Sequence, residues 1–259
     1  MRIRVFGSSV AALCLLMSAG CASVPVTQLS LNYVAPAQGA QTKSVKVALV
    51  KPQFAGTQAK APMPAVGGIF GNIMNAQMEK YATPEFAIGE KYNKDYAQRV
   101  QNSMLSDLEK VLKVRGLNLS QAYDSFDEIP YSDKQKVDMI VVPSFDFGPQ
   151  VTNKRTSTYI PYYGTKYNDE GTVQLVGKLK VEFIEPMSKE KIIIKTIDVT
   201  SLSATYSAQY ASKDEALNVF TDMLNSLYPL LMAKVEKITD ADEIQLSLKD
   251  IKRLKEKNQ

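Results

Sequence analysis

Histidine is absent from this sequence, and cysteine occurs only at positions 14 and 21. Without an imidazole there is no histidine general base and none of the usual histidine-containing zinc sites. Long apolar runs are missing as well, because no segment after the first 21 residues reaches about 18 consecutive apolar residues. These absences exclude histidine-based catalysis and argue against a membrane-spanning helix in the rest of the chain.

The first 20 residues have the pattern of a secretory signal peptide. Arg2 and Arg4 precede an apolar run of about 13 residues that starts at Val5, and small residues precede Cys21. This ending resembles the lipobox of bacterial lipoproteins, in which the cysteine is lipidated and becomes the first residue after cleavage. Ser18 stands where the lipobox usually has leucine. The alternative is an ordinary secreted protein whose Cys21 lies near the cut by chance.

The lipobox resemblance implies a palmitate-bearing lipid anchor at Cys21 and, because Ala22 follows it, an outer-membrane location. Cys14 would leave with the signal peptide, so no free thiol would remain for a disulfide or a nucleophile. The chain has 31 Lys+Arg and 27 Asp+Glu. Loss of Arg2 and Arg4 leaves 29 against 27, a net charge of +2. Such a balance argues against binding to nucleic acid.

Composition divides the remainder into three parts. Residues 21–43 are expected to form a flexible tether, residues 44–238 a single α/β domain, and residues 239–259 a charged C-terminal helix. Residues 55–90 are expected to be an insertion in that domain. Within it, the apolar residues of Val66–Met78 fall at helical spacing. This patch predicts either a lid or helix that contacts a membrane or a partner, or an amphipathic turn docked on the core.

Apolar periodicity predicts a β-α-β-α-β order followed by an antiparallel hairpin and helices. The fold class is therefore α/β (α+β), with a mixed sheet of about five strands packed by two long helices. Pro229 lies within the second long helix and is expected to kink or split it. Ser212–Glu215 has the form of a capping box that opens this helix. The expected segments are strands at 45–50, 117–123, 137–147, 173–183 and 191–204, and helices at 92–115, 212–238 and 239–259. A short helix capped by Ser132 is expected within the acidic segment 124–136.

The segment 148–170 is the candidate binding site. It is expected to be a loop of more than 20 residues, which is uncommon in a compact domain unless it is functional or disordered. Arginine binds carboxylates bidentately, and a tyrosine ring can cover a sugar face, so the composition suits an acidic glycan. It equally suits a protein interface, or an ordered tyrosine-rich loop at the edge of the sheet. Its basic and aromatic residues are Lys154, Arg155, Tyr159, Tyr162, Tyr163, Lys166 and Tyr167.

Acidic residues gather before the expected strand at 137–147. They lack the spacing of a metal site or a catalytic pair, so the cluster is interpreted as a solvated turn. We therefore expect no catalytic residues, no metal and no cofactor. The cluster comprises Asp124, Asp127 and Glu128, and Asp133 and Asp138 follow it.

Several passages, in the same order along the chain, resemble the Helicobacter-type family of neuraminyllactose-binding haemagglutinins, which are also known as flagellar-sheath or surface adhesins. The passages are Leu31-Asn32-Tyr33, Lys51-Pro52-Gln53-Phe54, Lys154-Arg155-Thr156 and Ile184-Glu185-Pro186-Met187-Ser188. The resemblance covers most of the chain after the signal peptide, with residues 55–90 as an insertion.

This resemblance implies a lipid-anchored adhesin of the cell envelope that binds sialic acid on glycans. The family's proposed sialic-acid motif is a basic run that starts Lys-Arg-Thr, which Lys154, Arg155 and Thr156 match; here Ser157-Thr158-Tyr159 follows in place of further lysines. The alternative is an envelope or flagellar assembly scaffold, facing the periplasm, that binds protein partners or a second copy of itself without binding glycan.

Overall fold

The computed structural model describes residues 25–36, 43–56, 84–202, 206–210 and 213–257. The predicted patch Val66–Met78, the signal peptide and Cys21 lie outside these ranges. The strands are β1 (Lys46–Val50), β2 (Gln53–Phe54), β3 (Asn118–Tyr123), β4 (Met139–Phe145), β5 (Gly148–Ile160), β6 (Gly164–Val176), β7 (Lys178–Ile184), β8 (Lys191–Asp198) and β9 (Tyr206–Tyr210). The helices are α2 (Pro84–Lys91), the π-helical turn η1 (Tyr92–Tyr96), α3 (Ala97–Val114), α4 (Tyr131–Lys134), α5 (Lys213–Ile238) and α6 (Ala241–Lys257).

The described strands form two sheets. The larger has the order β3-β1-β4-β7-β8, and the short β2 also pairs with β4. β1 is parallel to both β3 and β4, whereas β7 is antiparallel to β4 and β8. The smaller sheet is antiparallel, with the order β5-β6-β9. The mixed sheet, the late antiparallel hairpin and the long helices confirm the predicted fold class.

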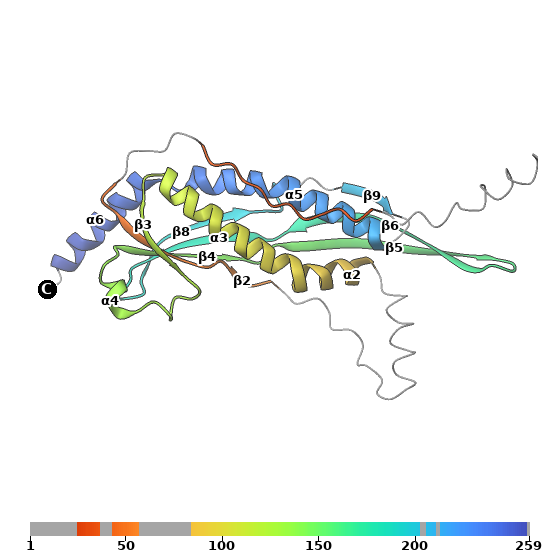
Figure 1. Cartoon of the computed structure of the whole chain (residues 1–259), viewed down its shortest axis with the longest axis horizontal. Coiled ribbons are helices and arrows are strands. Elements are labelled where there is room, and N and C mark those ends of the chain that lie inside the picture. Colours follow the sequence, from red (N-terminus) through yellow and green to blue (C-terminus); the bar gives the residue numbers. More distant parts are fainter. Residues whose placement is uncertain (1–24, 37–42, 57–83, 203–205, 211–212, 258–259) are drawn as a thin grey trace, which may run out of the picture.

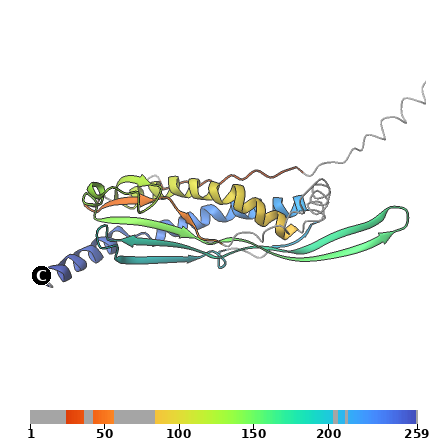
Figure 2. The same ribbon diagram turned by 90° about the horizontal axis from the view of Figure 1, so that it is seen from below.

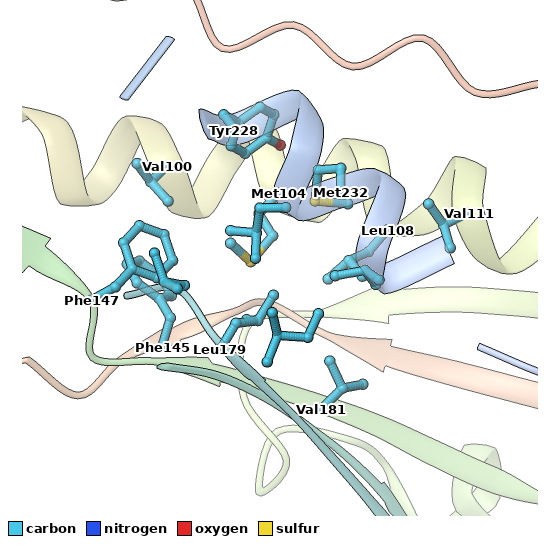
Figure 3. Packing of buried hydrophobic residues seen from close by; sticks show 14 of the residues in the cluster. Val100, Met104, Leu108, Val111, Phe145, Phe147, Leu179, Val181, Tyr228 and Met232 are labelled. Carbon is cyan, nitrogen blue, oxygen red and sulfur yellow. The ribbon is translucent and has the colours of Figure 1, made fainter. Parts of the chain in front are cut away.

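Helices cover one face of this assembly (Figures 1 and 2). α3 and α5 pack on each other, and α2 contacts both α5 and β5. The core between helices and sheet is apolar and tightly enclosed, with Val100, Met104, Phe145, Leu179 and Met232 at its centre (Figure 3). Burial of such side chains is worth about 1.5–3 kcal/mol each, so this layer accounts for most of the fold's stabilisation.

The first long helix starts earlier than its apolar stripe indicates. α2 begins at Pro84, inside the predicted insertion, and runs through η1 into α3. Tyr92 and Tyr96 in η1 are both buried. The Tyr92 hydroxyl donates to the Phe147 carbonyl (2.7 Å), and the Tyr96 hydroxyl lies 2.9 Å from Thr221 Oγ1. The π-helical turn thus places both phenols where the core offers polar partners.

The predicted strand at 173–183 is wrong, because it is divided at Gly177 into β6 and β7, where Gly177 has φ 118° and the chain passes from one sheet to the other. Of the two effects predicted for Pro229, a kink or a split, the split does not occur, since α5 continues through this residue. Leu227, Tyr228 and Leu231 on either side of the proline are buried, and this packing outweighs the hydrogen bond that proline cannot donate.

Residues 25–36, here called the N-terminal strap, lie extended along α5 (Figure 1). The expected tether is therefore fastened over these residues. Tyr33 is buried, and its hydroxyl donates to the Glu236 carboxylate near the end of α5. Two asparagine side chains of α5 each bond to the strap backbone in both directions. The bonds are Thr27 N to Asn218 Oδ1 (2.8 Å), Asn218 Nδ2 to Pro25 O (2.7 Å), Ser30 N to Asn225 Oδ1 (2.7 Å) and Asn225 Nδ2 to Gln28 O (3.0 Å).

Candidate functional site

The predicted loop 148–170 is a long antiparallel hairpin, so the expectation of an irregular loop is wrong. β5 and β6 pair without a break from Gly148↔Val176 to Ile160↔Gly164. The segment is rich in threonine and tyrosine, which favour strands. Its outer half carries polar residues on both faces and lacks the alternation by which a half-buried strand is recognised.

The inner half of the hairpin belongs to the body of the molecule. Val151, Val173 and Leu175 are buried in the main core, and β9 pairs with β6 as far as Asp169↔Tyr210. Beyond that pair the two strands project alone from the end of the molecule at which α5 begins (Figures 1 and 2). The outer half is therefore an exposed two-stranded ribbon on a rigid base.

Large side chains crowd the end of the ribbon. We define the hairpin tip as residues 159–163. Tyr162 is fully exposed, and Tyr163 and Tyr159 are 89% and 72% exposed. The turn closes with a hydrogen bond from Tyr163 N to Ile160 O (3.1 Å), and both Tyr162 (φ 69°) and Gly164 (φ 81°) have left-handed backbone. Three exposed tyrosines on one tight turn form a small aromatic contact surface.

The structure brings only part of the predicted site together. Tyr159, Tyr162 and Tyr163 share the tip, and the exposed Lys166 lies two residues beyond its closing glycine. In the strand register, Arg155 lies opposite Asp169, five residue steps from the last pair of the ribbon. Lys154 lies opposite Glu170, six residue steps from that pair. At about 3.4 Å per step, Arg155 is about 17 Å from the end of the ribbon. The basic and aromatic groups therefore do not converge on one small site.

The remaining predicted residues lie between these two ends. Thr156 pairs with Asn168, and Tyr167 pairs with Ser157. In this register Lys154 and Arg155 occupy positions opposite Glu170 and Asp169. Sequence reasoning found the residue types at the site but missed the projecting strands that spread them along one axis.

Two of the acidic residues before β4, Asp133 and Asp138, have basic partners. Asp133 accepts from Lys136 and from the Tyr123 hydroxyl, and these bonds, with Lys136 first, lower the pKa of its carboxyl. Asp138 accepts from Lys46 N (3.0 Å) and pairs with Lys252. Over the described ranges, no three acidic, cysteine or histidine residues gather in a way that would hold a metal ion.

A shallow pocket of about 440 Å³ lies at the opposite end of the molecule, away from the hairpin. It is bounded by α4, the turn between β7 and β8, and α6, and its walls include Lys134, Met187 and Leu248. Its mixed walls include Lys252 and Asp138, which already neutralise each other. The pocket therefore offers no unpaired charge from this pair for an ionic ligand.

The apolar stripe of α5 is occupied by the chain itself. Phe220, Leu224, Leu227 and Leu231 are buried in the main core. The stripe is therefore part of the core, and these four side chains are not available as a surface for a second copy. Among the described helices, none combines the length and the apolar character that crossing a bilayer requires.

The described chain is thus a mixed α/β fold with a projecting, aromatic-tipped hairpin. No protein-family model matches the chain, and neither does any curated protein sequence. A solved Helicobacter pylori protein, described as a neuraminyllactose-binding hemagglutinin homolog, superimposes with a TM-score of 0.57 at 17% identity. The match covers 88% of this chain and 100% of that one. At this identity the similarity establishes a shared fold.

Two other solved structures are more distant. A Xanthomonas campestris protein of the DUF330 family has a TM-score of 0.29 and 9% identity, over 78% of this chain and 89% of its own. A PelC dodecamer from Paraburkholderia phytofirmans has a TM-score of 0.28 and 10% identity, over 75% and 95%. Similarities at this level carry no conclusion about this chain.

Proposed function

We propose that this chain is an outer-membrane lipoprotein, anchored through Cys21, that acts by binding through the β5–β6 hairpin. The observation that carries the proposal is the hairpin tip, where Tyr162 is fully exposed and Tyr163 is 89% exposed. Tyrosine is enriched in binding surfaces because it offers a large apolar ring and a polar hydroxyl at low entropic cost. Holding such rings in water at the end of a projecting ribbon favours contact with another molecule.

The anchor is tested by replacing the cysteine. Cys21→Ser should abolish palmitate labelling and release the chain from the outer-membrane fraction. Cys14→Ser is the matched control, because position 14 lies within the signal peptide, and it should leave both readouts unchanged. Palmitate label that persists in the Cys21→Ser chain would contradict the anchor.

For the ligand, the family resemblance favours a sialylated glycan. A ligand carboxylate would receive charge-assisted hydrogen bonds from Lys154 or Arg155, each worth roughly 1.5–3 kcal/mol. Replacing both by alanine should then weaken sialyllactose binding about tenfold to a hundredfold per bond lost. Replacing Lys178 and Lys189, which lie outside the ribbon, provides the control. No binding of the wild-type chain at millimolar sialyllactose would exclude this ligand.

A protein partner in the envelope or flagellar sheath is the second candidate. The ribbon favours it because aromatic and basic groups spread over about 17 Å match a flat macromolecular surface better than one sugar residue. Light scattering at several concentrations tests self-association, and crosslinking in cells identifies other partners. Crosslinks that survive substitution of Tyr162 and Tyr163 would place the partner elsewhere on the molecule.

A further inference from the structure

The hairpin tip has the composition of a membrane-interface segment. Its residues Tyr159, Ile160, Pro161, Tyr162 and Tyr163 are all exposed. Tyrosine is concentrated where membranes meet water, because its ring is apolar and its hydroxyl stays hydrated. Isoleucine and proline beside it add apolar area without a charge. A tip of this kind gains free energy when it enters a headgroup layer.

The backbone conformation of Tyr162 indicates that this residue contacts another molecule. A left-handed φ of 69° is unfavourable for a bulky residue, and glycine or asparagine would adopt it at lower cost. The side chain of Tyr162 is fully exposed, so packing within the molecule does not offset this conformational cost. The position therefore presents an aromatic ring to something outside the chain.

The N-terminal strap fixes the direction from which the anchor arrives. Pro25 is bonded to Asn218, the sixth residue of α5, so the chain enters at the end of the molecule that carries the hairpin (Figure 1). Cys21 precedes Pro25 by four residues and thus lies within about 14 Å of it. An anchor on Cys21 would hold this end of the molecule toward the membrane.

The hairpin is long enough to reach that membrane. Asn218 lies five residues after the start of α5, and the end of the ribbon lies five residue pairs beyond the last pair of β6 with β9. Five helical rises and five strand steps together span about 24 Å. Four residues reach at most about 14 Å from Pro25, so the end of the ribbon extends at least as far in this direction as Cys21 can. A tip at that level can meet the headgroup layer, which interfacial segments enter to a depth of about 5–10 Å.

Charge near the hairpin tip suits an anionic surface. The part of the ribbon beyond the pair Arg155↔Asp169, residues 156–168, has one cation, Lys166, and no acidic residue. The cation nearest the tip, Lys166, is exposed and pairs with Thr158. Basic residues beside interfacial aromatic groups attract anionic phospholipid headgroups.

We infer that the hairpin tip is a second membrane contact, which enters the headgroup layer of the anionic membrane that holds the lipid anchor. The inference rests on the proposed anchor at Cys21 and names the surface that the proposed binding element meets. Anchor and tip together hold the molecule at two points. This fixes its orientation, with the pocket end and α6 directed away from the bilayer.

The absence of tryptophan makes a single-probe experiment possible. Tyr163→Trp introduces one indole at the tip, and Tyr131→Trp introduces one on α4, at the opposite end, where Tyr131 is 65% exposed. Each acylated chain is reconstituted into vesicles of phosphatidylethanolamine and phosphatidylglycerol. Brominated phospholipid should quench emission from position 163 several-fold more than from position 131, and only position 163 should show a shift to shorter wavelength.

Failure of the anchor and failure of the tip contact are distinguishable. Mass spectrometry of the purified chain reports acylation of Cys21. If Cys21 is acylated and the indole at 163 remains unquenched, the tip contact is overturned and the anchor stands. If Cys21 is not acylated, the anchor fails. The unacylated chain on the same vesicles then tests the tip contact alone. Quenching of the indole at 163 supports the contact, and absence of quenching overturns it.

Other occupants of the tip give different signals. A shift at position 163 caused by sialyllactose without vesicles, together with no quenching by bromolipid, overturns the inference in favour of a glycan. A shift that grows with protein concentration, again without quenching, overturns it in favour of a second copy of the chain. A further pair of variants tests residue type: Tyr162→Asn, which suits the left-handed turn, should weaken vesicle binding at least about tenfold, whereas Tyr131→Asn should not.

Discussion

A buried phenol, Tyr228, holds the two long helices of the helical layer together. The Tyr228 hydroxyl donates to Asp107 Oδ2 (2.7 Å), and Lys110 contacts the other oxygen of the same carboxylate. Asp107 is only 4% exposed, so the tyrosine supplies a hydrogen bond that water cannot readily replace. Tyr228 and Asp107 thus connect α5 to α3 through a buried polar contact.

Removing that hydroxyl should destabilise the fold. Tyr228→Phe leaves one buried carboxylate oxygen without its donor, and we expect a loss of about 1–3 kcal/mol in the free energy of unfolding. Urea denaturation followed by circular dichroism measures it. Tyr131→Phe, at an exposed position, should stay within about 0.5 kcal/mol of wild type. Equal stability of the two variants would show that the Tyr228–Asp107 bond makes no net contribution.

Buried phenols also predict an alkaline transition. Burial raises the pKa of Tyr92, and burial followed by the Asp107 carboxylate raises the pKa of Tyr228, in both cases above the ordinary value of 10.0. Each phenol has a higher pKa in the folded chain than in the unfolded chain. Its contribution to the free energy of unfolding is therefore complete below pH 10 and is lost as the pH rises toward the folded pKa. Ionisation of these two phenols, followed by ultraviolet absorbance, should therefore coincide with unfolding. Their ionisation while circular dichroism stays native would contradict this assignment.

At the scale of elements, Gly177 determines where one sheet ends and the next begins. Its φ is 118°, and a Cβ there would lie 2.6 Å from Phe147 Cα. Gly177→Ala should therefore cost about 2–5 kcal/mol, from both strain and overlap with backbone. Gly164→Ala, with φ 81° but no neighbouring atom within 4 Å, should cost only about 1 kcal/mol. Chemical denaturation compares the two, and a smaller loss at Gly177 than at Gly164 would refute the explanation of the break.

The N-terminal strap makes a second prediction at this scale. Asn218 and Asn225 fasten it by four hydrogen bonds to its backbone. Replacing both by alanine should release residues 25–30, so that limited proteolysis cuts there much sooner than in wild type. Asn102→Ala on α3 is a control outside the strap. Unchanged cleavage in the double variant would mean that the apolar contacts of Leu29, Leu31 and Tyr33 are sufficient.

The sequence predicted elements with a buried face and missed those without one. Val100 and Met104 of α3 repeat at helix spacing because one side of the helix faces the core, and β1 is a short run of apolar residues because both of its faces are buried. The outer part of β5–β6 faces solvent on both sides, so its residues carry no such repeat. The strap was missed for a related reason, since Leu29, Leu31 and Tyr33 are isolated apolar residues in a polar segment.

The candidate site was predicted as a set of residues, not as a shape. Tyr159, Tyr162 and Tyr163 were singled out by composition, and the structure gathers them at one tip. Arg155 was assigned to the same site, but strand pairing holds it about 17 Å away along the ribbon. Such separation depends on strand register, which requires long-range pairing and could not be deduced from local composition.

At the scale of the whole molecule, the start of the strap and the projecting hairpin lie at the same end of the fold. The chain enters at the end from which the β5–β6 ribbon projects, while α4 and the start of α6 lie at the other end (Figure 1). A lipid at Cys21 would therefore bring the aromatic tip close to the membrane and turn the opposite end toward the surrounding space.

The central claim is that this chain works from a lipid anchor through its hairpin tip. A photo-crosslinking amino acid placed at position 163 in intact cells tests it most directly, with the same group at position 131 as control. The account predicts adducts to membrane components from position 163 but not from 131, and at least a tenfold loss of these adducts when Cys21→Ser removes the anchor. Adducts that form equally from both positions, or that persist unchanged without Cys21, would contradict the account.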